Sequence, residues 1–287
     1  MPDTPQTLDS LRRRIDEIDD AIHDLIMQRA ALVHDIAAAK NGDPLAMRPG
    51  REAAILRRLA ARHAGGFPLP ELTRIWRELI AGCTRMQAPF AVAVHAPESR
   101  GELWDLAHDH YGSHTPMTAV AGPIQAIRAV HDGSAAVAVV PWPVESDADP
   151  WWQVLLSDDP RTPRVVGSLP FVVTERHRDE PLALAVAQID PEPTGDDHAL
   201  IAVEVTGDIS RSRLKQTFEA AGLPPVAFWT RPARTPEDSA IHLVDVADFV
   251  AAGDGRLATL AGPLEELAPR IRLIGGFATP ITIGRRS

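Results

Sequence analysis

The segment LDSLRRRIDEIDDAIHDLIMQRAALVHDIAAAK, residues 8–40, decides the fold of the N-terminal part of this chain. Apolar residues recur in it at steps of three and four, from Leu8 to Ile36, and it contains neither proline nor glycine. This spacing predicts one amphipathic helix from residue 6 to about residue 40, which Asn41-Gly42-Asp43-Pro44 ends. Such a helix is roughly 50 Å long. Its apolar stripe is longer than a small helical domain can cover, so it requires a partner helix, most simply from a second copy.

Two shorter helices complete the N-terminal part. One is predicted from Pro49 or Gly50 to about His63, because Ala64-Gly65-Gly66-Phe67-Pro68 provides an end signal. The other is predicted from Pro70 to about Gln87. The apolar face expected for the second of these helices consists of Leu72, Ile75, Trp76, Leu79, Ile80 and Cys83.

The periodicity changes after Phe90. Short apolar runs such as FAVAVHAP, residues 90–97, alternate with helical patterns, which predicts a parallel α/β layer. VVGSLPFVV, residues 165–173, is expected to be another strand, and DPEPTGDD, residues 190–197, a polar linker. The order after that linker is strand, helix, strand, strand, helix, strand, which is the order of a ferredoxin-like fold.

We therefore expect a multidomain chain. Residues 1–88 form an all-α three-helix domain, residues 89–190 an α/β lobe, and residues 191–287 a ferredoxin-like α+β domain. The run DPWWQVLLSDDP in the lobe is expected to be a helix or a helix-like turn. Trp142, Trp151 and Trp152 could form a platform for a ligand, but packing of the lobe against a neighbour is the more frequent explanation for such residues.

The composition excludes several classes of function. The 287 residues have a formal net charge of -10, of which residues 1–87 contribute +1. An acidic chain lacks the basic stripe that nucleic-acid binding needs, and no run approaches the ~20 apolar residues that span a bilayer. The N-terminus has no secretory signal pattern. The single cysteine, Cys83, allows no internal disulfide and offers no metal-ligand spacing, so we expect a cytoplasmic protein without a metal.

Arg29 and Lys40 are the candidate binding residues of the long helix. They are separated by eleven residues, so they face nearly the same direction, about 16 Å apart along the axis. Two such cations could hold opposite ends of one small polyanion. Arg12 faces about 100° away, so it could serve only the site of a partner chain. The alternative is that all three are solvated helix charges.

Three motifs resemble the all-helical type of chorismate mutase: LRRRIDEIDDAIHDLIMQRAALVHDIAAAK, MRPGREAAILRRL and IWRELIAGCTRMQ. The resemblance covers residues 8 to 87, about the whole length of that domain. It implies an intertwined homodimer that binds chorismate without a cofactor and in which Arg12 crosses into the site of the other chain. The catalytic residues it implies are Arg12, Arg29, Lys40, Arg51, Glu52 and Gln87, and the additional substrate-binding positions are Arg48 and Cys83.

The resemblance also implies roles for these residues. Arginines clamp the two carboxylates of chorismate, while Lys40 and Gln87 donate to the ether oxygen on which negative charge develops. Glu52 accepts a hydrogen bond from the ring hydroxyl; alternatively, it only complements the dipole at a helix N-terminus. Cys83 stands where the family usually has serine, so substrate binding is expected to be weaker, unless this thiol is simply a small buried residue.

The remaining segments resemble, in their order, the bifunctional chorismate mutase and prephenate dehydratase, whose last module is an ACT domain. The dehydratase turns are altered: Ala96-Pro97-Glu98-Ser99-Arg100 lacks the family's Gly and Thr, and Val144-Glu145-Ser146 lacks its Asn. About 110 residues suffice for one lobe, whereas a cleft between lobes needs two. We therefore expect a remnant lobe without dehydratase activity.

The ACT-like segment implies an amino-acid effector, by analogy phenylalanine. Its expected pocket motif is altered, because Phe228-Trp229-Thr230-Arg231-Pro232 keeps only the family's Arg-Pro. The alternative is that this domain only dimerises or covers the lobe. The function expected overall is chorismate mutase activity; the two alternatives are a bifunctional mutase and dehydratase, and a non-catalytic amino-acid sensor.

Overall fold

The computed structural model describes residues 7–39, 47–97, 101–145, 147, 149–174, 182–207, 209–235 and 238–283. The chain divides into two compact units, each described here by itself. The first comprises residues 1–47 and 82–89, and the second comprises residues 48–81 and 90–287. The three domain ranges expected from the sequence stay a prediction, since compactness groups the chain differently and assigns part of the helical segment to the second unit.

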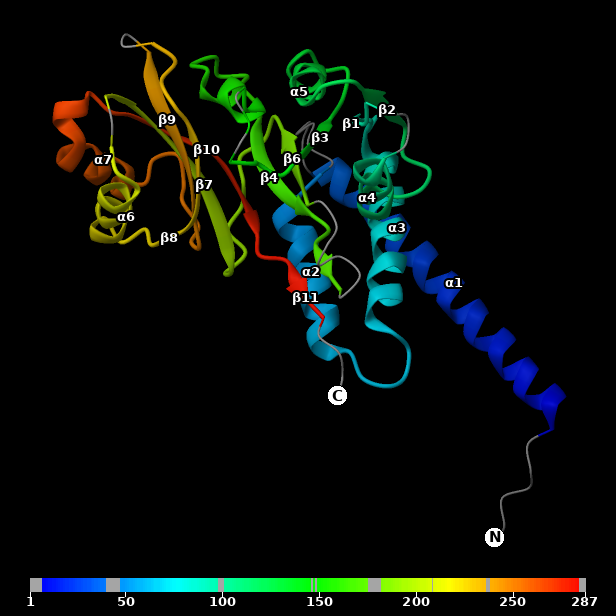
Figure 1. Ribbon diagram of the computed structural model, residues 1–287. Coiled ribbons are helices and arrows are strands. Elements are labelled where there is room, and N and C mark those ends of the chain that lie inside the picture. Colours follow the sequence, from blue (N-terminus) through cyan, green and yellow to red (C-terminus); the bar gives the residue numbers. More distant parts are fainter. Residues whose placement is uncertain are drawn as a thin grey trace. The chain divides into compact units, whose positions relative to one another are not determined.

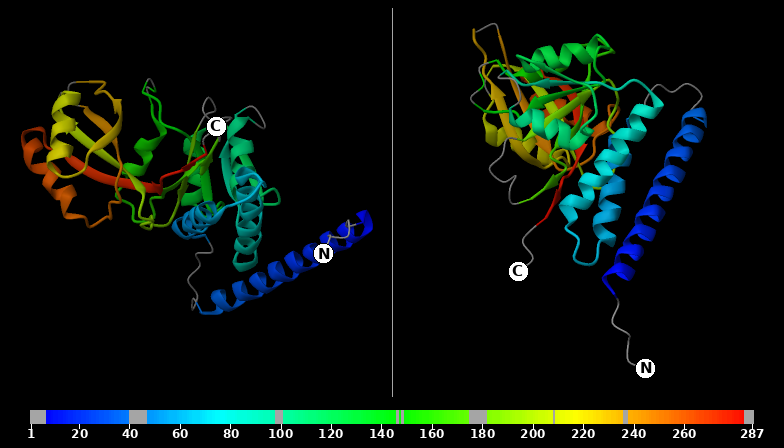
Figure 2. Two further views of the ribbon diagram at one scale, coloured as in Figure 1. Left: turned by 90° about the horizontal axis from the view of Figure 1, so that it is seen from below. Right: turned by 90° about the vertical axis from the view of Figure 1, so that its right-hand side faces the viewer.

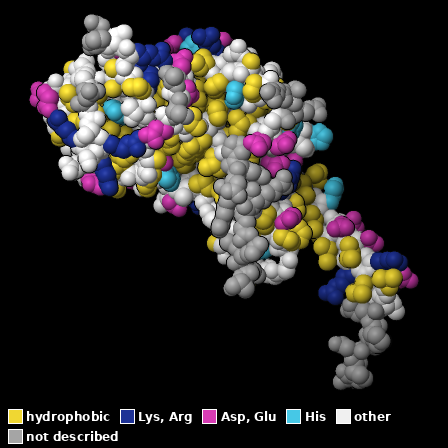
Figure 3. Space-filling model, viewed as in Figure 1, with side chains coloured by type: hydrophobic (Ala, Val, Ile, Leu, Met, Phe, Trp, Pro, Cys, Tyr) yellow, Lys and Arg dark blue, Asp and Glu magenta, His cyan; other side chains and the backbone are white. Residues whose placement is uncertain are grey.

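In the first unit, α1 (Leu8–Ala39) confirms the long helix predicted from the apolar spacing. The unit also contains the C-terminal end of α3 (Leu69–Gln87). Most large apolar side chains of α1 are exposed, with exposed fractions of 40% to 63% for Leu8, Leu11, Ile15, Ile18, Ile22, Leu25, Met27, Leu32 and Ile36. Figure 3 shows hydrophobic side chains open along this helix between charged ones. A single chain therefore leaves this apolar stripe in contact with water.

The second unit begins with α2 (Pro49–Arg62), whose first position is the proline predicted to start it. Ala53 and Leu56 of this helix are buried against Phe171, which lies far away in the sequence. The same cluster includes residues of β5 (Val172–Val173) and β11 (Ile281–Thr282), two short strands that pair in parallel. Figure 1 shows α2 beside β11. Helix α2 is thus packed on the α/β part of the chain.

The buried face of α3 differs in part from the one that the sequence predicts. Within the predicted face Ile80 is buried, Leu72, Trp76, Leu79 and Cys83 are half-buried, and Ile75 has an exposed fraction of 46%. The other buried residues lie on a neighbouring, more polar face: Thr73, Arg77, Ala81 and Thr84. Buried polar groups need hydrogen-bonding partners, and Arg77 obtains one from α2, as described below. A periodicity analysis that counts only apolar residues assigns this face to solvent.

One mixed sheet runs through the second unit in the order β2-β1-β3-β6-β4-β10-β7-β9-β8. The expected parallel layer is confirmed for β1 (Val92–His95), β2 (Met117–Val120) and β3 (Val137–Pro141). Helices α4 (Glu102–Tyr111) and α5 (Pro123–His131) connect these strands, as crossover connections require.

Beyond β3 the pairing in this part of the sheet is no longer only parallel. β6 (Ala183–Ala187) pairs antiparallel with β3 and with β4 (Arg164–Leu169). The segment VVGSLPFVV, expected as one strand, is divided into β4 and β5 around Pro170, which follows a cis peptide bond. Proline has no N–H to donate to a ladder, which accounts for the division.

The C-terminal part has the predicted order of elements: β7 (Asp197–Thr206), α6 (Arg211–Ala220), β8 (Pro225–Arg231), β9 (Ser239–Val246), α7 (Gly255–Ala261), the 3-10 helix η3 (Gly262–Leu267) and β10 (Arg270–Ala278). Its strands lie in the order β10-β7-β9-β8 and all neighbours are antiparallel. Helices α6 and α7 lie on one side of these strands (Figure 1 and Figure 2) and share an apolar cluster with them.

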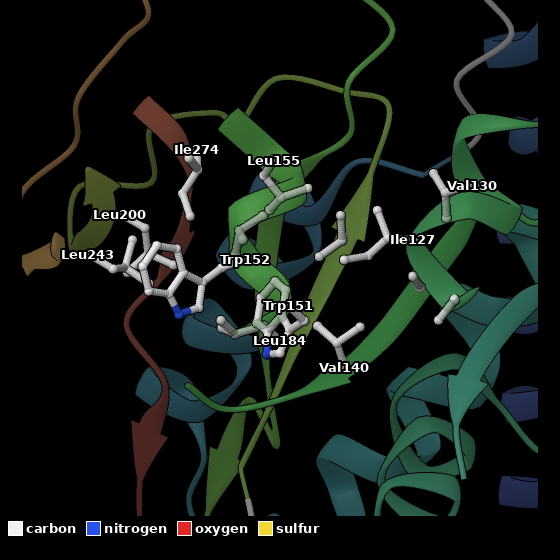
Figure 4. Packing of buried hydrophobic residues seen from close by; sticks show 14 of the residues in the cluster. Ile127, Val130, Val140, Trp151, Trp152, Leu155, Leu184, Leu200, Leu243 and Ile274 are labelled. Atoms are coloured by element: carbon white, nitrogen blue, oxygen red, sulfur yellow. The ribbon is translucent and has the colours of Figure 1, made fainter. Parts of the chain in front are cut away.

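The other face of these strands packs on the lobe through tryptophans. The run DPWWQVLLSDDP contains the 3-10 helix η1 (Trp151–Leu156), which confirms the helix-like turn. Trp151 and Trp152 are 3% and 1% exposed, and Figure 4 shows Trp152 directed toward Leu200 and Leu243. The preferred interpretation of these residues, packing of the lobe against a neighbouring part of the chain, is confirmed. The described helices include none long and apolar enough to cross a membrane.

Candidate functional site

The C-terminal end of α3 meets α1 at three of the predicted site residues. Arg29 of α1 donates a hydrogen bond from Nη1 to Cys83 Sγ, at 2.8 Å. One turn further along α3, Gln87 Nε2 donates to the carbonyl oxygen of Cys83, at 3.2 Å. All three residues are partly buried, so their polar groups remain accessible while their positions are held by contacts. The first unit therefore assembles a guanidinium, a thiol and an amide in one place.

The other predicted residues of α1 are placed differently. Arg12 lies on the exposed side of the helix, where its guanidinium is 3.5 Å from the carboxylate of Asp9. That Arg12 serves the site of a partner chain stays a prediction. Lys40 lies outside the described residues.

Arg48, Arg51 and Glu52 stand at the beginning of α2 in the second unit. Arg51 is exposed. Arg48 donates from Nε to Glu192 Oε1 at 2.8 Å, and its Nη2 contacts the same oxygen. The predicted linker is thus bonded to the start of α2. Arg57, two turns further on, strengthens this attachment with hydrogen bonds to Thr194 and to the backbone of Asp196.

Glu52 forms a buried ion pair that the sequence analysis did not anticipate. Arg77 Nη1 donates to Glu52 Oε2 at 2.9 Å, and the two side chains are only 8% and 13% exposed. Burial raises the pKa of the Glu52 carboxyl, although the Arg77 charge and a backbone hydrogen bond from Arg48 oppose this shift. Burial also lowers the pKa of Arg77. The first-turn position of Glu52 agrees with the alternative helix-dipole role, and the two roles do not exclude each other.

Arg77 is the residue that sequence reasoning missed. Its guanidinium lies over the ring of Phe171, 5.5 Å from the centroid. The available signal was an arginine amid small and apolar residues at helical spacing, Thr73, Ile80, Ala81 and Thr84, which together mark a face packed against protein. The partner residues could not be identified in advance, because Glu52 and Phe171 are distant in sequence.

No group of three or more His, Cys, Asp or Glu side chains placed to hold a metal occurs in the part of the chain that the structure describes.

Comparison with known proteins supports the resemblance found in the motifs. Residues 11–88 match the family model of chorismate mutase type II. The bifunctional chorismate mutase/prephenate dehydratase of Pseudomonas aeruginosa is 32% identical over 141 residues, which cover 47% of this chain and 38% of that protein. The enzyme of the same name from Neisseria gonorrhoeae is 35% identical over 115 residues, covering 38% and 32% respectively. The chain thus spans about two fifths or less of the length of these curated relatives.

Two solved structures match much of this chain at low similarity. A prephenate dehydratase from Streptococcus mutans has a TM-score of 0.46 at 14% identity, covering 68% of this chain and 100% of that one. A prephenate dehydratase from Arthrobacter aurescens, in complex with L-Phe, has a TM-score of 0.47 at 13% identity, covering 66% and 90%.

Proposed function

We propose that this protein is a chorismate mutase, which rearranges chorismate to prephenate. The observation that carries the proposal is the cluster of Arg29, Cys83 and Gln87, which lies within the segment that matches the chorismate mutase type II family. These residue types suit a substrate with two carboxylates and an ether oxygen. The guanidinium can bind a carboxylate of such a substrate, and the amide can donate a hydrogen bond to its ether oxygen.

The reaction is an intramolecular pericyclic shift, so it requires no nucleophile and no proton transfer. The protein contributes by holding the reactive conformer and by stabilising charge that develops on the ether oxygen. Arg29 and Arg51 supply planar forks for carboxylates, while Lys40 and the Gln87 amide donate to the ether oxygen. Arg48 and Cys83 complete the substrate contacts in this proposal, and Glu52 accepts from the ring hydroxyl.

A homodimer is part of the proposal. The exposed apolar stripe of α1, with Ile15 and Leu25 at 57% and 62% exposure, supports burial against a second chain. Arg12 lies on the same helix, and its exposed guanidinium is available to the site of a partner. Each active site would then combine residues of two chains.

We infer that the α/β lobe has no dehydratase activity and that the ferredoxin-like segment is an ACT-type domain with a mainly structural role. Two residues of the altered pocket motif, Trp229 and Arg231, support a role for this segment in covering the lobe. Trp229 is 8% exposed and its ring lies 6.3 Å from that of Trp142 in the lobe. Arg231 is bonded to Asp238 at 2.7 Å. Trp229 is thus used in packing and Arg231 in an ion pair, which disfavours phenylalanine binding there.

The test is to incubate the purified full chain with chorismate and, separately, with prephenate, and to follow each by absorbance and chromatography. Conversion of chorismate with prephenate untouched is the expected result. Formation of phenylpyruvate from prephenate would instead favour the bifunctional alternative, which the names of the curated relatives suggest for those proteins. Inertness toward both compounds would contradict the proposal and favour an amino-acid sensor, and calorimetry with phenylalanine, tyrosine and tryptophan would then examine that alternative.

Replacing Cys83 with serine is expected to lower KM for chorismate about fivefold, equivalent to roughly 1 kcal/mol, because a hydroxyl is a better hydrogen-bond donor than a thiol. Turnover should change little. Steady-state kinetics with Cys83→Ala as the matched control check this prediction. Equal KM values for the serine and alanine variants would mean that residue 83 makes no hydrogen bond to the substrate.

A further inference from the structure

A cavity of about 410 Å³ lies in the second unit, beside the buried ion pair. Its walls come from the first half of α3, from α4 and from the segment that joins β4 to β5. This volume lies within the range of about 300 to 1,000 Å³ that small-molecule sites occupy. None of the residues predicted for the mutase site lines it.

Among the residues that line the cavity, Arg77 is the charged one that is buried, at 7% exposure. Within the described part of the chain, Glu52 is the one acceptor to which Arg77 donates a hydrogen bond, through Nη1. The guanidinium has four further N–H donors. A buried guanidinium with unused N–H donors is suited to binding a carboxylate, whose oxygens can accept hydrogen bonds from the second edge of the planar guanidinium.

Most of the surface that lines the cavity is apolar, although polar residues contribute to it as well. Leu106 of α4 lies on one side, and Pro170, Phe171 and Val172 lie on the other. The Phe171 ring that supports Arg77 therefore also borders the space beside it. This arrangement suits a flat apolar group attached to the carboxylate.

The remaining charges of the lining limit the ligand to one negative group. Arg74 is already paired with Asp109 at 2.5 Å. Burial, aided by the nearby Arg77 charge, holds the pKa of His110 well below its ordinary value, so this imidazole is neutral near pH 7. Glu71 adds a negative charge to the lining. Arg74 is also 62% exposed, so the buried guanidinium of Arg77, although paired with Glu52 through one donor, is the cation of this lining best suited to a single carboxylate.

We propose that this cavity binds a small monocarboxylate with an aromatic or similarly flat apolar body. The site is distinct from the residues assigned to chorismate, and the proposal does not depend on the mutase activity. Because Arg77 also holds Glu52, an occupant of the cavity shares its anchoring residue with the beginning of α2.

The experiment titrates the full chain with phenylacetate and with phenethylamine, which share a ring and differ in charge. Binding is followed by NMR of ¹³C-labelled leucine and valine methyl groups. Phenylacetate is expected to shift the methyl resonances of Leu106 and Val172, and phenethylamine is expected to bind at least tenfold more weakly. Equal affinities, or shifts confined to other methyl groups, would overturn the proposal, as would no binding at 10 mM phenylacetate.

Two matched variants distinguish binding of the carboxylate by Arg77 from the general effect of removing a positive charge. Removing Arg77 alone would leave Glu52 as an unpaired buried carboxylate, so the double substitution E52Q/R77Q replaces both charges with neutral groups of similar size. It is expected to lower phenylacetate affinity at least tenfold. Arg58→Gln, at an exposed arginine of α2 that does not line the cavity, should change affinity less than twofold. Undiminished binding in a folded double variant would show that Arg77 is not the anchor.

Discussion

Replacing Lys40 with alanine is expected to lower kcat for chorismate about 10²- to 10³-fold, equivalent to roughly 3 to 4 kcal/mol of activation free energy. In the proposed mechanism the Lys40 ammonium faces the ether oxygen, where negative charge grows as the C–O bond breaks. This interaction is stronger in the transition state than in the ground state, so its loss should lower kcat more than it raises KM. Lys40→Arg should not restore turnover, because a guanidinium is wider than an ammonium and presents its charge differently.

The chain provides a matched control for this measurement, because it contains only one other lysine. Lys215 lies on α6, is exposed, and pairs with Glu219 at 3.7 Å. Lys215→Ala should leave both kcat and KM within twofold of the unsubstituted protein. Sedimentation of the Lys40 variant should match that of the unsubstituted protein, so that loss of assembly does not explain lost turnover. Unchanged turnover in Lys40→Ala would refute the role of this residue.

The helices could be predicted from the sequence because the signals that define them are local. The apolar spacing that starts at Leu8 and the proline at position 49 indicate α1 and the start of α2 without reference to the rest of the chain. The same holds for the element order after residue 196, where short apolar runs and helical patterns alternate. Arg29, Cys83 and Gln87 could be selected because they stand in sequence motifs that resemble those of the chorismate mutase family, and such motifs are also local.

The second unit could not be predicted to the same extent because its contacts join distant residues. Arg77 is bonded to Glu52 and stacked on Phe171, and no periodicity links these three positions. The antiparallel position of β6 between β3 and β4 is likewise a matter of pairing, which the composition of each strand leaves open. The buried face of α3 was predicted only in part for a related reason: Arg77 can be buried because it has a partner, Glu52, that only the fold provides.

Gly275 is the position at which a single added methyl group should destabilise the second unit most. It joins the two halves of the nine-stranded sheet, because β10 pairs with β4 at Gly275 and Val165. A Cβ at residue 275 would lie 2.2 Å from the carbonyl oxygen of Val165 and 2.4 Å from its nitrogen. These are backbone atoms of a strand that is itself buried, so neither can move aside easily. The φ angle of +138° adds backbone strain for any other residue.

We therefore expect Gly275→Ala to reduce the free energy of unfolding by about 4 kcal/mol or more. Urea titration followed by tryptophan fluorescence measures this directly, since Trp151 and Trp152 lie in the core that this sheet covers. Gly222→Ala is the matched control, because Gly222 also has a positive φ, of +74°, but no atom within 4 Å of its Cβ position. That variant should lose only about 1 to 2 kcal/mol from backbone strain. Similar losses in the two variants would mean that β4 and β10 are not held in contact, and the sheet would then be two sheets rather than one.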